Sequence, residues 1–220
     1  NPMRQVATVM QVSNEAYRQI VNVNGAAGGW VGETDARPQT DSPKLDEFKP
    51  AFGELYANPA ATQKLLDDAF FDIEMWYASE IAQTFAEKEG DSFVNGNGTN
   101  KPKGLLAYTT AAPDDKTRAY GTLQHIATAA AGSITYDDLI SISYALRAGY
   151  RQKAAWMLNS TALSSVRKLK DDQGNYIWQP SQQAGQPSML AGFAVVENED
   201  MPAVASGALP IAFGDFKRAY

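Results

Sequence analysis

The sequence predicts a mixed α+β fold with a long extended arm. Residues 57–96 have the apolar spacing of one long amphipathic helix. Between residues 133 and 216, helical and strand-like segments interleave. Residues 17–56 offer few apolar side chains for a core, and residues 34–53 alone contain three prolines. The three observations together indicate a folded body, a strut-like helix and a projecting arm.

The composition is that of an ordinary folded protein, and it excludes several classes of function. The chain has 220 residues, of which 44% are hydrophobic, and its formal charge is −6. A dedicated nucleic-acid binder would carry a basic face, so this charge argues against one. The absence of cysteine excludes disulfides and thiolate chemistry. No apolar run approaches the ~20 residues that span a bilayer, so we expect no membrane partner.

The arm is the first predicted element. "YRQIVNV" (17–23) predicts a strand that ends in the turn "NGAAGG", and "WVGE" (30–33) predicts the start of a second strand. One arm of roughly 15–18 extended residues reaches about 50–60 Å, whereas a globule of this length has a radius of gyration of ~17 Å. We therefore expect the arm to project. The apolar residues that it would expose are candidate subunit contacts: Trp30, Val31, Phe48 and Phe52.

The long helix follows the arm. Asn58 with Pro59 predicts its start, and Asn95 with Gly96 predicts a left-handed stop, about 45 Å away. Its predicted buried stripe consists of Leu66, Ala69, Phe70, Ile73, Trp76, Tyr77, Ile81, Thr84 and Phe85. A helix this long would span a whole domain.

The remaining chain predicts the body. Thr135 and Asp138 form a capping-box pattern at the head of a helix over 133–150. "AAWML" (154–158) predicts a short buried strand, and Asn159 or Ser160 would cap a helix over 159–170. Three later segments complete the prediction: a turn leading into a strand (171–180), and strands within 191–198 and 210–216.

A glycine-rich segment, "FVNGNGTNKPKGLL" (93–106), invites comparison with phosphate-binding loops. Its spacing fits neither the Walker pattern nor the dinucleotide fingerprint, because Gly104 comes six positions after Gly98 and is followed by Leu105. The segment also follows the end of a helix, where the helix dipole disfavours anions. We interpret it as a helix stop and a tight loop.

The sequence predicts no catalytic, cofactor or metal site. The single histidine, His125, excludes a site with two imidazoles and has no serine-elbow pattern beside it. Asp68 and Asp72 stand one helical turn apart and would suit a hydrolase, but the polar side of a long amphipathic helix is expected to be acidic and solvated in any case. We therefore expect a protein that is not an enzyme and has no cofactor. A hydrolase using Asp68 and Asp72 remains the alternative from another class.

Several segments, in order, resemble the major capsid proteins of tailed bacteriophages, which share the HK-ninety-seven-like shell fold. "GGWVGE" (28–33) and "FGELYANPAATQKLLDDA" (52–69) resemble the family's extended loop and its return to the body. "DIEMWYASEIAQTFAEKEGDSFVNGNGTNKPKGLL" (72–106) resembles the spine helix and its glycine turn. The family's axial domain is similar to "WMLNSTALSSVRKLKDDQGNYIWQPS" (156–181), "LAGFAVVENEDMP" (190–202) and "IAFGDFKRAY" (211–220).

The resemblance implies a division of the chain. Residues 1–16 would be an N-terminal segment, 17–56 the extended loop and 57–106 the spine helix and glycine turn of a peripheral domain. Residues 107–220 would form the axial domain. Family chains continue beyond a segment like "GDFKRAY", so the C-terminal part of that domain is expected to be missing. Lys44 and Lys49 lie in the loop region, but we infer no covalent cross-linking from them.

The resemblance also implies a structural function. The chain would be a capsid subunit of a phage or prophage, made in the bacterial host cytoplasm and located in the virion. It would assemble with neighbouring subunits into pentamers and hexamers around double-stranded DNA, touching the DNA only non-specifically, with a portal and a head-maturation protease as further partners. A second use of the same fold, an encapsulin-like compartment shell that loads an enzyme, stays open at this point.

Overall fold

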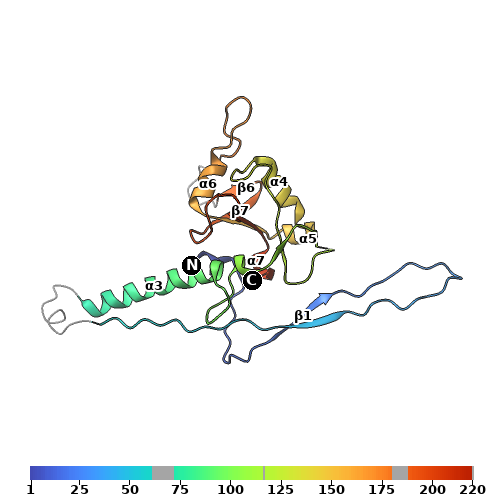
Figure 1. Ribbon diagram of the computed structural model, residues 1–220, viewed down its shortest axis with the longest axis horizontal. Helices are drawn as coiled ribbons and strands as arrows, with labels where there is room; N and C mark the ends of the chain where they lie inside the picture. Colours follow the sequence, from blue (N-terminus) through green and yellow to red (C-terminus); the bar gives the residue numbers. More distant parts are fainter. Residues whose placement is uncertain (61–71, 116, 180–187, 220) are drawn as a thin grey trace.

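The computed structural model describes residues 1–60, 72–115, 117–179 and 188–219. It shows a folded body, a long helix beside it and an arm that extends away from both (Figure 1). In chain order the elements are α1 (Pro2–Val6), β1 (Gln19–Asn24), β2 (Lys44–Phe48), α3 (Ile73–Asn95), the 3-10 turn η1 (Leu105–Ala107), β3 (Thr110–Ala111), β4 (Leu123–Gln124), α4 (Tyr136–Ala145), α5 (Ala148–Arg151), β5 (Ala155–Leu158), α6 (Ser160–Arg167), β6 (Met189–Leu190), β7 (Phe193–Glu197), β8 (Ile211–Gly214) and α7 (Phe216–Ala219). The mixture confirms the α+β prediction.

The body is built on a four-stranded sheet in the order β6-β7-β5-β8. β5 lies at its centre, parallel to β7 and antiparallel to β8. The predicted burial of β5 is correct, because Trp156, Met157 and Leu158 are fully buried. The Trp156 indole N–H donates to the carbonyl of Leu190 at 3.0 Å, and its ring lies 4.3 Å from that of Phe213, measured between centroids. The central strand is thus fixed to both of its flanks.

Two capped helices pack on this sheet. The capping box predicted for α4 is present, with the Thr135 hydroxyl accepting from the Asp138 backbone and the Asp138 carboxylate accepting from the Thr135 backbone at 2.9 Å. α4 ends at Ala145, earlier than predicted, and α5 follows as a separate short helix. Asn159 caps α6 by accepting from Ala162 N at 2.8 Å. Leu139 of α4 and Val166 of α6 belong to the same core as Trp156.

The other face of β5 packs against the N-terminal segment and the end of α3. Met3, Val94, Met157, Met201 and Phe216 form this second core. The N-terminus therefore belongs to the folded body, which the sequence analysis did not foresee. A five-residue helix is too short to show a periodic pattern, and α1 is held by tertiary contacts instead.

The long helix departs from its prediction in three ways. Asp72 caps its N-terminus, while residues 58–60, where the start was predicted, are not helical. Gly96 ends it in an extended conformation with φ −61°, so the predicted left-handed stop is wrong. Of the predicted stripe, Ile73 is buried but Trp76 is 45% exposed. The predicted stripe residues Leu66, Ala69 and Phe70 lie outside the described residues.

The arm is a hairpin-like ribbon of β1 and β2, paired antiparallel from Gln19 with Phe48 to Asn24 with Lys44. The first strand was predicted, although it begins two residues later than expected. The second was misplaced: "WVGE" (30–33) is not a strand, and the partner strand comes at Lys44. The turn between β1 and β2 is longer than the sequence indicated. The strand that pairs in register with β1 therefore lies further along the chain than predicted. Figure 1 shows the ribbon extending away from the body.

Candidate subunit interface

The four predicted contact residues lie on the arm, but they do not form one cluster. Trp30 is fully exposed at 104% and, with Val31, lies in the long connection between β1 and β2. Phe48 ends β2, and Phe52 lies four residues further along, where the chain returns to the body. All four side chains are exposed. The arm thus presents apolar groups at two places, one near its tip and one near its base.

The arm also exposes apolar side chains that the sequence analysis missed. Ile20 and Leu45 are both exposed, and the register puts them on one face of the ribbon, since Ile20 pairs with Glu47 and Leu45 with Asn22. The sequence carried no clear signal for this, because Leu45 and Phe48 in "KLDEF" are three residues apart and fall on opposite faces of a strand. An isolated two-stranded ribbon is at best marginally stable in water. Its described ion pair, Arg18 with Glu47, is exposed and adds little.

The base of the arm is attached to the glycine turn. A Cβ on Gly53 would stand 2.3 Å from the carbonyl oxygen of Asn100, so the returning chain touches the 96–104 loop directly. In that loop the N–H of Gly104 donates to Gly96 O at 2.7 Å. Gly98 adopts φ +76°, which glycine accommodates readily. The segment is a tight loop after the helix, as predicted, and its glycines also allow close backbone packing.

Charged contacts fix α3 to the rest of the chain at its C-terminal half. Arg4 of α1 forms an ion pair with Glu89, and Asn1 donates to the same carboxylate at 3.2 Å. The hydrogen bond from the Arg4 guanidinium is the largest influence on Glu89 and holds the pKa of that carboxyl below its usual range. Asn95 donates to the carbonyl oxygen of Asp200 at 3.1 Å and so joins the end of α3 to the turn after β7.

The pKa of Asp200 is shifted in the opposite direction from that of Glu89. Its carboxylate lies against Gly90, where a Cβ would come within 2.6 Å of Oδ2. Burial raises the pKa of Asp200, and the neighbouring acids Asp91, Glu199 and Glu87 raise it further. The contact between α3 and this turn therefore carries like charges at neutral pH.

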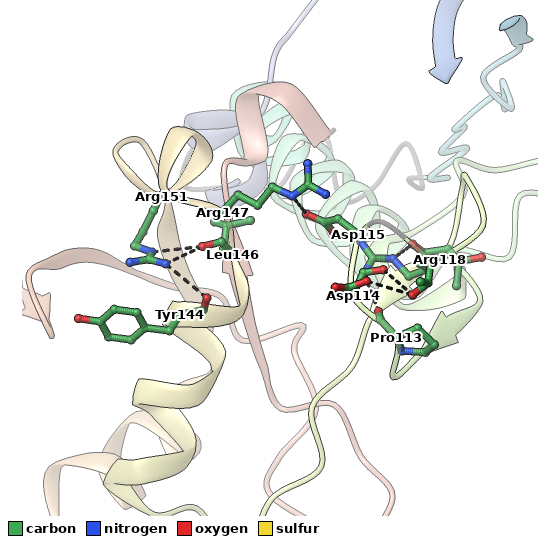
Figure 2. Close-up of polar contacts among 10 residues, drawn as sticks. Pro113, Asp114, Asp115, Arg118, Tyr144, Leu146, Arg147 and Arg151 are labelled. Atoms are coloured by element: carbon green, nitrogen blue, oxygen red, sulfur yellow. Dashed lines mark hydrogen bonds and ion pairs between the residues drawn. The ribbon is translucent and has the colours of Figure 1, made fainter. Parts of the chain in front are cut away.

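A second polar group connects the 113–118 loop to the α4–α5 connection (Figure 2). Asp115 forms ion pairs with Arg118 and with Arg147, the latter at 3.4 Å. Arg118 also donates to the Pro113 carbonyl at 3.0 Å. On the other side of the connection, Arg151 donates to the Leu146 carbonyl at 2.8 Å and stacks on Tyr144. These arginines satisfy loop carbonyls and the end of α4.

The candidate hydrolytic pair is not assembled in the part of the chain that the structure describes. Asp72 is exposed and accepts a hydrogen bond from Met75 N at 3.0 Å, so it acts as a helix cap, and Asp68 lies outside the described residues. His125 follows β4, and its backbone N–H donates to Ala111 O at 3.0 Å. Within the described ranges, no group of three or more metal-ligating side chains comes together. No described helix has the length and apolar character needed to cross a membrane.

The comparisons with known proteins decide the family. The model of the phage capsid family matches residues 1–220. The chain belongs to the phage capsid family. No curated protein shows significant similarity to it.

Solved structures agree with this membership. A structure described as the capsid of a native GTA particle, computed with C5 symmetry, is 40% identical with a TM-score of 0.88. The match covers 98% of this chain and 73% of the GTA capsid chain. The capsid of the empty GTA particle matches equally well. A Mycobacterium phage Bobi structure, at 17% identity, shares the fold with a TM-score of 0.63, and the match covers 99% of this chain and 69% of the phage chain.

This phage capsid protein is therefore a structural subunit of an oligomeric shell, located in the virion. The encapsulin-like compartment and the hydrolase are not favoured by these comparisons. Exposed apolar side chains on the arm and on helix α3 are expected in such a protein, because the subunits of a shell bury apolar surface against their neighbours.

Proposed function

We propose that the chain self-assembles into the pentamers and hexamers of an icosahedral phage or prophage shell that encloses double-stranded DNA. The observation that carries the proposal is the arm, which exposes the whole of Trp30 on a ribbon with little core of its own. Tryptophan is among the residues that most often dominate binding energy at interfaces. Its position on an arm of a capsid-family chain makes a neighbouring subunit the natural partner.

In this proposal the chain divides as the family resemblance implies. Residues 17–56 form the loop that reaches a neighbour, and residues 57–106 form the spine of a peripheral domain. Residues 107–220 form the axial domain around the symmetry axes, and residues 1–16 are an N-terminal segment. The second core, in which Met3 meets Val94, supports placing the N-terminus against the spine.

The proposed partners beyond neighbouring subunits follow from the assembly of such a shell. A portal and a head-maturation protease would act on it in the bacterial host cytoplasm, where the chain is made. Contact with packaged DNA would be non-specific, in agreement with the formal charge of −6. The chain would need neither catalysis nor a cofactor for this role, because buried area between subunits supplies the stability.

The test is the assembly state of the purified full-length protein. Size-exclusion chromatography with light scattering gives its mass, and negative-stain microscopy of the largest fraction gives its shape. We expect rings or closed shells. A well-folded protein that stays monomeric at all concentrations and salt conditions would overturn the proposal. The Trp30→Ala variant serves as the matched comparison, since its monomer should fold normally.

A further inference from the structure

Two asparagine–glycine pairs follow each other at the end of α3, Asn95-Gly96 and Asn97-Gly98. An asparagine that precedes glycine is open to attack on its side-chain Cγ by the backbone nitrogen of the glycine, because glycine has no side chain in the way and the two groups are already neighbours. The attack closes a five-membered succinimide and releases ammonia. Water then opens the ring to aspartate or isoaspartate. The structure places the two pairs in opposite situations.

The first pair is held away from this reaction. Asn95 is the last residue of α3, and its side-chain amide donates to Asp91 Oδ1 at 2.9 Å and to the carbonyl oxygen of Asp200 at 3.1 Å. The attacking nitrogen is engaged as well, since the N–H of Gly96 donates to Ser92 O at 3.0 Å. Attack at Asn95 therefore requires the last turn of α3 to unwind and its contact with the turn after β7 to break.

The second pair is much easier to open. Asn97 is exposed and lies outside the helix, where it faces Lys103 in a single isolated bridge. Opening that bridge releases only the loop residues 98–102. Local opening of a short exposed loop costs less free energy than unwinding a helix end that is bonded to the body. The nitrogen of Gly98 is therefore far more accessible for attack than that of Gly96.

The loop also favours the reaction electrostatically. The backbone N–H of Thr99 donates to Asn97 Oδ1 at 3.1 Å. This amide oxygen gains negative charge as Gly98 attacks, so a donor is already in place where the charge develops. Lys101 and Lys103 are exposed in the same loop, and no acid occurs between residues 92 and 113. The positive local field stabilises both the deprotonated glycine nitrogen and the anionic intermediate.

We propose that Asn97 is a self-modification site, which the folded protein converts to aspartate and isoaspartate while Asn95 is preserved. The Gly98 nitrogen bonds to Asn97 Cγ, the bond from Cγ to the side-chain nitrogen breaks, and ammonia leaves with the proton that Gly98 gave up. Hydrolysis of the succinimide then adds one water. Nothing is oxidised or reduced, and solvent water is the other reactant. The inference concerns a single chain and goes beyond its proposed assembly.

The modification falls on the loop to which the base of the arm is attached. Gly53, where the chain returns from the arm, packs against the backbone of Asn100 in this loop. Isoaspartate adds one carbon to the main chain inside a loop that the hydrogen bond from Gly104 N–H to Gly96 O closes at 2.7 Å. The aspartate product instead adds one negative charge beside the two lysines. Both products alter this attachment permanently.

The test incubates the purified full-length chain in mildly alkaline buffer and follows deamidation by peptide mass spectrometry. Fragment ions assign the mass increase to Asn95 or Asn97. In the folded chain, Asn97 should react at least about tenfold faster than Asn95, because the two openings differ in free energy. The matched control is the same chain in urea, where both pairs lose their neighbours and their rates should agree within about threefold.

Two further measurements test the mechanism. A succinimide opens on either side, so aspartate and isoaspartate should both appear at Asn97, and the rate should rise with pH because the Gly98 nitrogen attacks after losing its proton. The Asn97→Gln variant, whose longer side chain would have to close a six-membered ring, should stay unmodified at this position. Lys101→Gln should slow the reaction at Asn97 by about twofold or more, since it removes part of the positive field.

The proposal has clear outcomes against it. Equal rates at Asn95 and Asn97 in the folded chain would overturn it, and so would an Asn97 that stays intact over a time that modifies it in urea. Aspartate as the sole product would replace the succinimide by direct hydrolysis and overturn the mechanism. Because the mass of a peptide does not depend on assembly, none of these results bears on the proposed shell function.

Discussion

The backbone N–H of Gly104 donates a hydrogen bond to the carbonyl oxygen of Gly96 at 2.7 Å and closes the loop that follows α3. Neither residue has room for a side chain. A Cβ on Gly104 would stand 2.5 Å from the Gly96 nitrogen and from the Val94 carbonyl, and a Cβ on Gly96 would stand 2.1 Å from Pro102 O. The glycines of this segment thus allow two stretches of backbone to pack closely at the end of α3.

Replacing Gly104 should therefore destabilise the fold. Gly104→Ala places a methyl group against backbone atoms that cannot move independently, and we expect a loss of about 2–3 kcal/mol in the free energy of unfolding. Gly149→Ala is the control, because no atom beyond its chain neighbours and its own helix lies within 4 Å of an added Cβ. Urea denaturation of both variants measures the difference. Equal stabilities would show that the loop can open without cost.

The two tryptophans Trp156 and Trp76 should respond differently to truncation. Trp156 is fully buried at the centre of the sheet, so Trp156→Ala should cost about 3–5 kcal/mol. The apolar periodicity of the helix alone predicts a similar loss for Trp76, but that side chain is 45% exposed and its described ring neighbour is Tyr77. We expect Trp76→Ala to cost less than about 1.5 kcal/mol in the unassembled chain. Denaturant titrations at low protein concentration compare them.

Trp30→Ala should spare the monomer and weaken association. The side chain has no surface buried within its own subunit, so the midpoint of thermal unfolding should stay within about 1 °C of the natural protein. A buried interface tryptophan contributes about 2 kcal/mol or more, which corresponds to roughly thirtyfold weaker association. Sedimentation velocity gives the association constant. A matching loss of monomer stability would mean that Trp30 packs on its own chain.

The ion pair between Arg4 and Glu89 should make attachment of α1 sensitive to acid. Because the pKa of folded Glu89 is lowered by its hydrogen bond from Arg4, the pair stabilises the fold above the unfolded pKa of about 4.3. That contribution is lost as the pH falls through the folded pKa. Glu89→Gln should be less stable than the natural chain by about 0.5–1 kcal/mol at pH 7, and the difference should shrink toward zero once the pH is below the folded pKa. Thermal unfolding from pH 3 to pH 7 measures it.

Asp200 should show the opposite dependence on pH. Its pKa is raised in the folded state by burial and by neighbouring acids, so the folded protein holds the proton more tightly than the unfolded one. Ionising Asp200 therefore costs stability as the pH rises through the folded pKa. Asp200→Asn should be more stable by about 0.5 kcal/mol at pH 7, with no gain at pH ~3. Unfolding curves in which Asp200→Asn is less stable at pH 7 would show that its carboxylate makes a favourable contact.

Local signals in the sequence identified the elements of the body. Thr135 with Asp138 and the amide of Asn159 mark the starts of α4 and α6, because a capping hydrogen bond is made within three residues of chain. The apolar run around Trp156 likewise identified β5 as a buried strand. Order and spacing of such segments were also enough for the family resemblance.

Tertiary structure alone decided the order of the sheet, the partner of β1 and the burial of α3. β6 has two residues, too few for a pattern, and every residue of β2 is exposed, so no buried face marks that strand. The spacing of Trp76, Tyr77 and Ile81 predicted an apolar stripe, but periodicity cannot say whether the surface that covers it lies in the same chain. The local sequence determines which apolar side chains lie on one face of an element. Whether that face is buried depends on which distant surface packs against it. In a shell subunit, we propose, that surface is partly a neighbour's.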